Sequence, residues 1–359
     1  MDFRKKTIRD VDWEGKTALV RVDYNVPLKD GKVVEDMRIR ASLPTINYLI
    51  EHGAKKIVLL SHLGRPNGQE NPELSLRPVA TRLAELMPKR LIAFVDMSIE
   101  GSIETALQKS PKDGGIILLE NLRFWPEEEA NSEEFARKII ERTKADVFVQ
   151  DGFAVIHRAH ASTDAMARLL PSVAGLLVEK EVSNLEGAIS NPEHPVLVII
   201  GGAKVADKQP MIDRFLPIAD KIAVGGKIAA DGYEATDEKI FVAKGFAENA
   251  DGAKLDIDEA SANEIIKMIN EAKTIIWNGT MGMTEEAEFS AGSRKIAEAM
   301  GHLDGVKTII GGGDTAGYVE SLMKEDDSLH YSLVSTGGGA SLELLSGKEL
   351  PGLEVLANR

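Results

Sequence analysis

Two lysines, Lys204 and Lys208, stand directly after the apolar run of residues 196–200 in the stretch VLVIIGGAKVADK. Such a run is typical of a strand that is buried on both faces, and Gly201-Gly202 ends it. A lone lysine usually lies on a solvated helix face. Two cations placed just beyond a buried strand and a glycine pair can instead neutralise a phosphate that approaches the glycine backbone. We therefore predict a phosphate-binding role for both lysines.

Glycines follow one strand-like run after another in the second half of the chain. The junctions read IIGGAK, AVGGK, IIWNGTMG, IIGGGDTAG and VSTGGGAS. One such glycine could simply make a tight turn between a strand and a helix. Five at one edge of a sheet expose many backbone N–H groups and helix N-termini, which suits phosphate. This half is predicted to bind a polyphosphate.

Asp314 lies inside one of these loops. The loop matches the dinucleotide-binding pattern with Gly311, Gly313 and Ala316, whereas no Walker pattern occurs in the chain. A carboxylate facing a pyrophosphate would be repulsive unless a divalent cation lay between them. Asp314 is therefore a candidate Mg²⁺ ligand for a nucleoside polyphosphate.

Basic residues take the place of glycines at the strand ends of the first half. They are Arg21, His62, Arg65, Arg123, Arg158 and His160, with Arg38 opening a helix. A single arginine is more often an ion-pair partner, but several at successive strand ends imply a small anionic substrate. Asp23 and Asn25 lie among them and could orient a hydroxyl group or an arginine. The histidine spacing matches no common zinc pattern.

The elements that position these residues follow from the pattern of apolar residues. Strands are predicted at 17–22, 55–60, 91–95, 115–120 and 145–149, and then at 196–200, 221–224, 274–277, 307–310 and 332–334. Amphipathic stretches between them predict helices, so the fold class is α/β with parallel sheets covered on both faces. Residues 171–192 read as one helix that joins two halves. In such sheets, ligands bind at the carboxyl ends of the strands.

Composition limits the remaining possibilities. The chain has 359 residues, with 43 Lys+Arg against 57 Asp+Glu, a net charge of −14, and no cysteine. The acidic balance argues against nucleic acid as a partner. Neither a signal-peptide core nor a run of membrane-spanning length is present, so we expect a cytoplasmic protein without a membrane partner.

The motifs together resemble the phosphoglycerate kinase family. The matching stretches run in order through almost the whole chain: RVDYNVP, RIRASLPTINYLIEHGAKKIVLLSHLGRP, LLENLRF, HRAHAS, GGAKVADK, WNGTMG, IIGGGDTA and VSTGGGASLELLSGKELPG. The resemblance implies a monomer with two Rossmann-like domains that face each other across an interdomain cleft. These would be residues 1–172 for the triose phosphate and 191–346 for the nucleotide, with a hinge helix at 173–190 and a tail, 347–359, packed on the first domain.

The resemblance also implies an activity and its residues. The reaction is reversible Mg²⁺-dependent phosphoryl transfer between 1,3-bisphosphoglycerate and ADP, which gives 3-phosphoglycerate and ATP. The triose site would use Asp23, Asn25, Arg38, His62, Arg65, Arg123 and Arg158, with His160 in support. The nucleotide site would use Lys204, Lys208, Gly225, Gly226, Asn278, Glu285, Gly313, Asp314, Thr315, Gly337, Gly338 and Gly339. Arg38, Lys204 and Gly338 would act on the phosphoryl group in flight, and Asp314 would hold the metal.

The chain departs from the family pattern near the expected nucleobase site. Lys227 replaces a usual glycine, the segment 231–255 is short, and Thr280 and Thr284 replace a proline and an aromatic residue. ADP is the expected partner, with another nucleoside diphosphate as an alternative. A non-catalytic binding protein of the same family and a dehydrogenase that uses Gly311 and Gly313 are the rival hypotheses.

Overall fold

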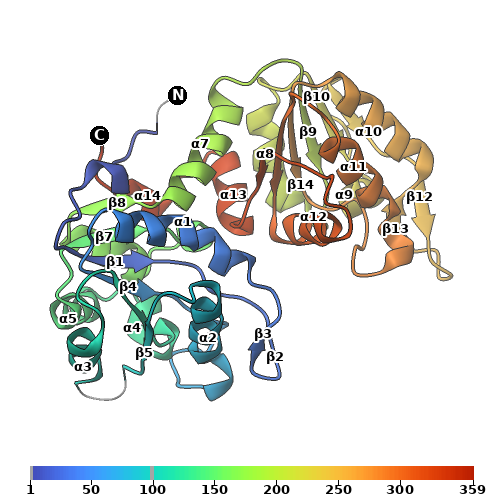
Figure 1. Cartoon of the computed structure of the whole chain (residues 1–359). Helices are drawn as coiled ribbons and strands as arrows, with labels where there is room; N and C mark the ends of the chain where they lie inside the picture. Colours follow the sequence, from blue (N-terminus) through green and yellow to red (C-terminus); the bar gives the residue numbers. More distant parts are fainter. Residues whose placement is uncertain (1–2, 98–100) are drawn as a thin grey trace. The chain divides into compact units, whose positions relative to one another are not determined.

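A computed structural model of the chain describes residues 3–97 and 101–359. The chain forms two compact units, each with its own sheet (Figure 1). One unit comprises the residues up to Val182 together with the last eleven residues, and we call it the N-terminal unit. The other runs from Ser183 to Lys348, and we call it the C-terminal unit.

The N-terminal unit is built on a six-stranded parallel sheet in the order β5-β6-β4-β1-β7-β8. The strands are β1 (Thr17–Arg21), β4 (Lys56–Leu60), β5 (Ile92–Val95), β6 (Gly115–Leu119), β7 (Val147–Gln150) and β8 (Ser172–Ala174). The helices are α1 (Met37–Glu51), α2 (Arg77–Leu86), α3 (Ser102–Lys109), α4 (Pro126–Glu129), α5 (Glu133–Thr143), α6 (Met166–Leu169) and α14 (Pro351–Glu354). A short hairpin, β2 (Leu28–Lys29) and β3 (Lys32–Val33), precedes α1.

The C-terminal unit has a second six-stranded parallel sheet in the order β11-β10-β9-β14-β15-β16. The strands are β9 (Val196–Ile200), β10 (Lys221–Val224), β11 (Ile240–Val242), β14 (Thr274–Asn278), β15 (Lys307–Gly311) and β16 (Leu333–Val334). The helices are α8 (Val205–Phe215), α9 (Gly226–Ala230), α10 (Glu259–Glu271), α11 (Ala291–Gly301), α12 (Gly313–Glu325) and α13 (Gly338–Leu345). A separate hairpin pairs β12 (Phe246–Glu248) with β13 (Lys254–Ile257).

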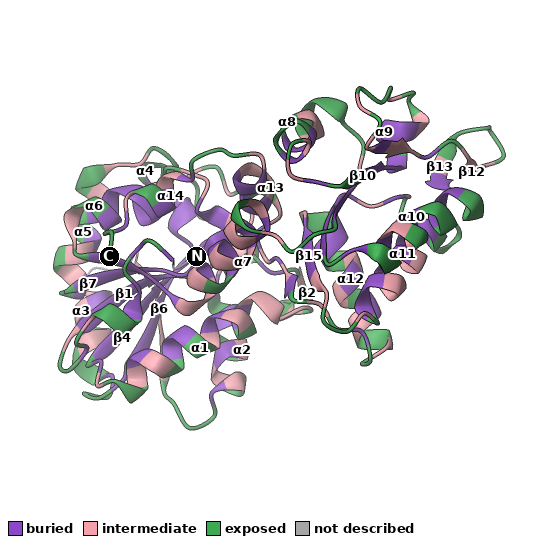
Figure 2. Ribbon diagram, turned by 90° about the horizontal axis from the view of Figure 1, so that it is seen from above, coloured by how far each residue is buried: buried purple, intermediate pink, exposed green. Residues whose placement is uncertain are grey.

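The central strands of both sheets are buried along their whole length, as the continuous apolar runs predict. Every residue of β1, β4, β6, β9 and β14 is buried (Figure 2). Each run predicted to be a strand forms one, which confirms the α/β class with two parallel sheets. Within the described residues, none of the helices combines the length and the apolar character that a membrane span requires.

The helix expected from residue 171 or 173 begins later. The connecting helix is α7 (Leu176–Ser190), and residues 172–174 instead form β8, the edge strand that pairs with β7. Two side chains fix the new start, since Thr45 Oγ1 accepts from the Leu176 N–H over 2.9 Å and Asp151 Oδ1 from the Leu177 N–H over 3.0 Å. Pairing to β7 and this side-chain capping outweigh the local helical pattern. The change of unit falls inside α7, after Val182.

The end of the chain packs on the N-terminal unit. The ammonium group of Lys5 donates to the carbonyl of Glu354 over 2.9 Å, and the Lys6 N–H donates to the carbonyl of Ala357 over 2.7 Å. Leu353 and Leu356 are buried. The tail is therefore part of this unit's core.

Candidate active site

Seven basic side chains form a group in the N-terminal unit, and six of them come from neighbouring strand ends. We call them the basic cluster, and they are Arg21, Arg38, His62, Arg65, Arg123, Arg158 and His160. Arg21 ends β1, His62 and Arg65 follow β4, Arg123 follows β6, and Arg158 and His160 follow β7. These four strands are adjacent and parallel, so their carboxyl ends share one edge of the sheet. Arg38 joins them from the first turn of α1.

Asp23 holds Arg38 in this cluster. Its carboxylate is buried and accepts a hydrogen bond of 2.6 Å from Nη1 of Arg38. The same nitrogen lies 3.3 Å from the carbonyl oxygen of Asn25. The Arg38 side chain is nevertheless 30% exposed. It is therefore oriented by Asp23 and still accessible to an anion.

His62 is held neutral. Nη2 of Arg21 lies 3.0 Å from Nδ1 of His62, and because a guanidinium group can only donate, Nδ1 is the acceptor. Burial and the positive charges of Arg21, Arg123, Arg38 and Arg158 hold the pKa of His62 well below its usual value. The proton of the neutral ring is therefore on Nε2, which can donate to a substrate oxygen.

Backbone contacts connect the loops that carry the other members of the cluster. Asn25 Oδ1 accepts from the Gly64 N–H over 2.8 Å, and Arg123 Nη1 donates to the Gly64 carbonyl over 2.9 Å. Burial, followed by the charge of Arg21, lowers the pKa of Arg123 to about 10. Burial, followed by the charges of Arg123, Arg21 and Arg158, lowers the pKa of His160 to about 4. The structure thus brings these residues together, whereas Arg65 lies exposed beside them.

Sequence reasoning noted Arg21 as a basic residue but did not assign it to the site. Arg21 is fully buried, and its Nε and Nη1 have no hydrogen-bond acceptor among the described residues. The charges of Glu128 and Asp23 oppose the effect of burial, which lowers the pKa of Arg21. Glu128, also fully buried, was missed altogether because its run PEEE reads as a solvated face.

In the C-terminal unit, glycine backbones meet at the carboxyl ends of the strands. A Cβ atom on Gly201 would lie 2.2 Å from the Thr280 carbonyl oxygen, and one on Gly226 2.8 Å from the Gly202 nitrogen. A Cβ atom on Gly338 would lie 2.4 Å from the Gly313 nitrogen. The predicted convergence of these junctions is therefore present, and only glycine permits it at these positions.

The helices that start at these junctions have uncapped N-termini. The N-cap residues of α8, α12 and α13 are Lys204, Gly312 and Gly337, and none of them makes a side-chain capping bond within the described part of the chain. By contrast, Asp258 caps α10 by accepting from the Ser261 N–H over 2.8 Å. Uncapped helix N-termini present free N–H groups to an anion.

Polar side chains lie between these glycine loops. The ammonium group of Lys208 donates to Asn278 Oδ1, and Thr315 Oγ1 accepts from the Gly279 N–H over 2.9 Å. Burial lowers the pKa of Lys208 against the attraction of Asp207 and Asp314. Asn278 is fully buried, and its Nδ2 has no acceptor among the described residues. The predicted residues Lys208, Asn278 and Thr315 therefore form one contiguous polar group.

Five other predicted residues of this unit are exposed, whereas Gly337 is buried and Gly338 is half-buried. Lys204, Gly313, Asp314, Gly339 and Glu285 are exposed. Within the described residues, no three acidic or histidine side chains gather as a metal-binding group. Mg²⁺ is commonly held by one or two carboxylates together with phosphate oxygens, so the single carboxylate of Asp314 in the first turn of α12 fits it.

Lys227, which replaces a glycine near the expected base site, forms an ion pair with a residue one helical turn further along the chain. Its ammonium group lies 2.7 Å from Asp231 Oδ1, and the lysine side chain is 61% exposed. The neighbouring Gly225 and Gly226 are buried. A Cβ atom on Gly225 would lie 2.5 Å from Met281 Sδ, so this glycine packs against an apolar side chain.

Comparisons with known proteins agree with this geometry. The family model described as "Phosphoglycerate kinase" matches residues 8–240 and 231–348. The phosphoglycerate kinase of Roseiflexus sp. (strain RS-1) is 43% identical over 397 residues, covering 98% of this chain and 99% of the relative. That of Chloroflexus aggregans is also 43% identical, over 402 residues and 99% of both chains. Because these alignments exceed 359 residues, this chain lacks residues that its relatives have.

Solved structures give the same result. The phosphoglycerate kinase of Coxiella burnetii matches with a TM-score of 0.79 at 32% identity, and that of Pyrococcus horikoshii with 0.83 at 28%. Each match covers 98% of both chains. The chain therefore belongs to the phosphoglycerate kinase family, whose members are phosphotransferases with a carboxyl group as acceptor.

Proposed function

We propose that this chain catalyses reversible, Mg²⁺-dependent phosphoryl transfer between 1,3-bisphosphoglycerate and ADP, with the basic cluster as the triose site and the glycine junctions as the nucleotide site. One observation carries the assignment of sites. Each parallel sheet collects anion-binding groups at the carboxyl ends of adjacent strands, as cationic side chains in the N-terminal unit and as uncapped helix N-termini in the C-terminal unit.

The chemistry requires little proton transfer. In the direction that consumes ATP, the nucleophile is the carboxylate of 3-phosphoglycerate, which is already ionised at neutral pH. No general base is needed, and the neutral His62 is unsuited to be one. Catalysis rests on positioning and on positive charge around a loose transition state.

The basic cluster would bind the triose and present it. Arg65, Arg123 and Arg158 would pair with its phosphate and carboxylate groups, and His62 would donate from Nε2. Asp23 and Asn25 would orient Arg38 and the Gly64 loop. Arg38, held at one nitrogen and partly exposed, is the arginine that we assign to the phosphoryl group in flight.

The glycine junctions would hold the nucleotide. Lys204 and Lys208 would neutralise its phosphates, and the N–H groups at Gly337, Gly338 and Gly339 would donate to the transferred group. Asn278, Gly313 and Thr315 would line the phosphate chain, Glu285 would bind the ribose, and Gly225 and Gly226 would lie beside the base. When bound, Mg²⁺ would supply positive charge to the phosphates, and Asp314 is the residue that would hold it.

Transfer also requires the two ligands to be in line. We assign the hinge to α7, because the chain passes from one unit to the other within this helix. The proposal includes a cytoplasmic location for the enzyme. It also includes a monomer, since one chain supplies every assigned ligand contact. Sedimentation at the concentration of the activity assay tests the monomer.

The deciding experiment measures Mg²⁺-dependent transfer to 3-phosphoglycerate with ATP, GTP and other triphosphates. We expect turnover with ATP and its loss in Lys204→Ala. The ranking of nucleotides reports on the shortened segment and on Lys227. A folded protein that binds 3-phosphoglycerate but turns over no nucleotide would favour the non-catalytic member of the family. Titration with NAD tests the dehydrogenase hypothesis.

A further inference from the structure

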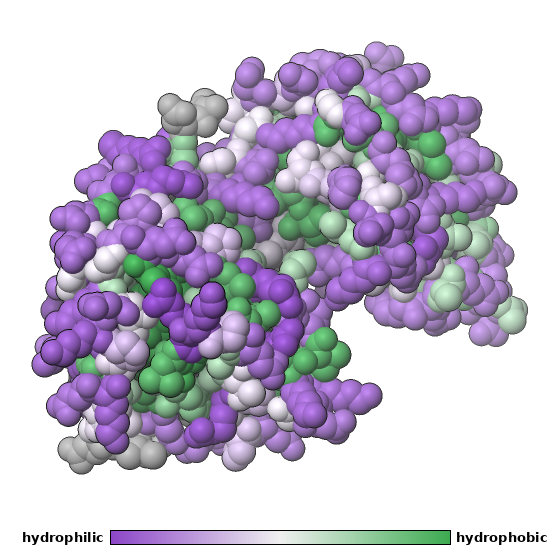
Figure 3. Space-filling view, viewed as in Figure 1, coloured by the Kyte–Doolittle hydropathy of each residue, from purple (hydrophilic) through white to green (hydrophobic). Residues whose placement is uncertain are grey.

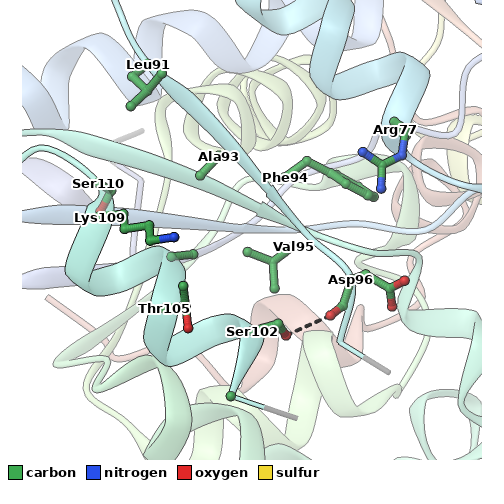
Figure 4. A pocket seen from close by; sticks show the side chains of 12 residues that line it. Arg77, Leu91, Ala93, Phe94, Val95, Asp96, Ser102, Thr105, Lys109 and Ser110 are labelled. Atoms are coloured by element: carbon green, nitrogen blue, oxygen red, sulfur yellow. Dashed lines mark hydrogen bonds between the residues drawn. The ribbon is translucent and has the colours of Figure 1, made fainter. Parts of the chain in front are cut away.

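A cavity of about 470 Å³ lies along the outer edge of β5 in the N-terminal unit (Figure 4). It extends between the first residue of α2, Arg77, and the helix α3. Its described lining residues include no member of the basic cluster. The cavity is therefore separate from the site described above, and its size falls in the range of small-molecule pockets.

The floor of the cavity is apolar. Leu91, Ala93, Phe94 and Val95 line it, and Leu91 is 60% exposed. Hydrophobic residues reach the surface of this unit around the position of β5 (Figure 3). A small ligand with an apolar body would cover side chains that are now open to water, which favours its binding.

The edge of the strand adds backbone groups. β5 is the last strand of the sheet, and the carbonyl oxygen of Val95 points to β6, where it accepts from the Glu120 N–H over 2.9 Å. Because successive residues of a strand direct their backbone groups to opposite sides, the N–H and C=O of Phe94 face the open edge. A polar group of a ligand can reach them there.

Two cations flank the apolar floor. Arg77 lies with its guanidinium carbon 4.6 Å from the centre of the Phe94 ring, so it is already placed on one side of the strand. Lys109 extends from α3 toward Ala93 and Val95 on the other side (Figure 4). Among the described residues, no carboxylate forms an ion pair with Lys109. In a chain of net charge −14, such a lysine over an apolar floor indicates an anionic ligand.

The hydroxyl groups of the cavity are mostly engaged. Ser102 Oγ donates to the Asp96 carbonyl over 2.7 Å, and Ser110 Oγ accepts from the buried ammonium group of Lys56 over 2.6 Å. The polar groups that a ligand would meet are therefore Lys109, the hydroxyl group of Thr105 and the edge of the strand, while Arg77 and the acidic residue Asp96 also line the cavity. One carboxylate matches them better than a polyanion would.

We propose that this cavity binds an aromatic monocarboxylate. Its carboxylate would pair with the ammonium group of Lys109 and accept from the Phe94 N–H, and its ring would lie on Leu91, Ala93 and Val95. The four-residue strand is too short to make an added peptide strand the better occupant.

The test uses the full chain with saturating ADP and 3-phosphoglycerate, which keeps the active site occupied. Binding of 3-phenylpropionate and of its neutral amide is measured by calorimetry and by saturation-transfer NMR. We expect the acid to bind saturably and the amide to bind roughly fivefold more weakly, the upper range for an exposed ion pair. Lys109→Met should cause the same loss, whereas Lys89→Met, an exposed lysine outside the lining, should cause none.

A second variant tests whether the acid binds in this cavity. Ala93→Leu adds volume to the floor of the cavity and should abolish binding of the acid, while turnover and the melting temperature show that the protein is folded. The proposal is overturned if the acid does not bind at millimolar concentration, if the amide binds equally well, or if both variants bind the acid as the parent does. Binding of the acid that appears only when 3-phosphoglycerate is left out would also overturn it, because the ligand would then occupy the basic cluster.

Discussion

Arg21 donates a hydrogen bond from Nη2 to Nδ1 of His62 over 3.0 Å, at the carboxyl ends of two adjacent strands. This contact sets the tautomer of a histidine that we assign to the triose site. Since the guanidinium group cannot accept, His62 can be protonated at Nδ1 only if this bond is lost. In the proposed function, the buried arginine would act on the substrate through the ring that it orients.

The first prediction concerns the charge of His62. We expect its ring to stay neutral, with the proton on Nε2, as the pH falls through the usual histidine range near 6.5, because burial and four arginines depress its pKa. Long-range ¹H–¹⁵N NMR spectra of the ring distinguish the tautomers. The unfolded chain binds a proton on this histidine below about pH 6.5, so its burial lowers the stability of the fold as the pH falls through that value.

Arg21→Met provides the control for this prediction, since the side chain keeps its bulk and loses its charge. We expect the pKa of His62 to rise in the variant. Normal titration of His62 near pH 6.5 in the parent protein would contradict the assigned tautomer.

The second prediction separates transfer from binding in the nucleotide site. Lys204→Ala should lower kcat by about 100-fold or more and change KM for ATP much less, because we assign the exposed ammonium group to the phosphoryl group in flight, where charge develops. Lys267→Ala is the matched control, since that ammonium group is exposed and paired with Glu264. Its kcat should stay within a factor of about two, in line with the small contribution of an exposed ion pair. Equal losses of kcat in both variants would show that the total positive charge of the protein matters, and not the position of Lys204.

The third prediction concerns triose binding. Arg65→Ala should raise KM for 3-phosphoglycerate by about tenfold or more with a smaller effect on kcat, as expected for the loss of one charged hydrogen bond. Arg40→Ala serves as the control because Arg40 is exposed and pairs with Asp36. Steady-state kinetics with 3-phosphoglycerate as the varied substrate decides the point. An unchanged KM in Arg65→Ala would remove Arg65 from the site.

The fourth prediction uses the contact between two glycine loops. In Gly338→Ala, the added Cβ would lie 2.4 Å from the Gly313 nitrogen, so the loops must separate and the N-terminus of α13 must shift. We expect a loss of turnover and a lower melting temperature of the C-terminal unit. Gly317→Ala within α12 is the control, since nothing lies within 4 Å of its added Cβ and alanine favours a helix by roughly 1 kcal/mol. Normal turnover in Gly338→Ala would contradict the assigned role of this loop.

Much of the fold could be predicted from the sequence because buried parallel strands have a strong signal. Runs such as residues 196–200 and 275–277 are apolar throughout, and the strands observed there extend beyond these runs by at most one residue at each end. Short edge strands lack that signal. Residues 172–174 follow a proline and precede a helix, and only pairing with β7 makes them extended.

The site could likewise be predicted from the sequence only in part. The positions of its residues at strand ends could be read from the sequence, because the carboxyl ends of parallel strands share one edge. The direction in which each side chain points could not be read from the sequence. Whether Arg21 turns inward to His62, or Lys227 outward to Asp231, depends on contacts between residues distant in sequence or on the local helix turn. Glu128 belongs to an acidic run that reads as solvent-exposed in the sequence, yet it is buried and its charge acts on Arg21.

The last prediction concerns Asp151 at the start of α7. Its carboxyl group is fully buried, accepts from the Leu177 N–H over 3.0 Å, and has its pKa raised to about 8, chiefly by burial. The unfolded chain releases this proton near pH 4, so the folded state binds more protons between about pH 4 and about pH 8. Its contribution to stability is therefore greatest at low pH and is lost as the pH rises through this window.

Asp151→Asn retains an acceptor for Leu177 and removes the titration. We expect the melting temperature of the variant, relative to the parent, to rise progressively from about pH 5 to about pH 8 and then to level off. Asp113→Asn is the control, because it removes one exposed carboxylate and so reports the effect of the lost charge alone. If the Asp151→Asn difference were independent of pH, the carboxylate would be ionised in the folded protein at neutral pH. The start of α7 would then be capped by a charged group.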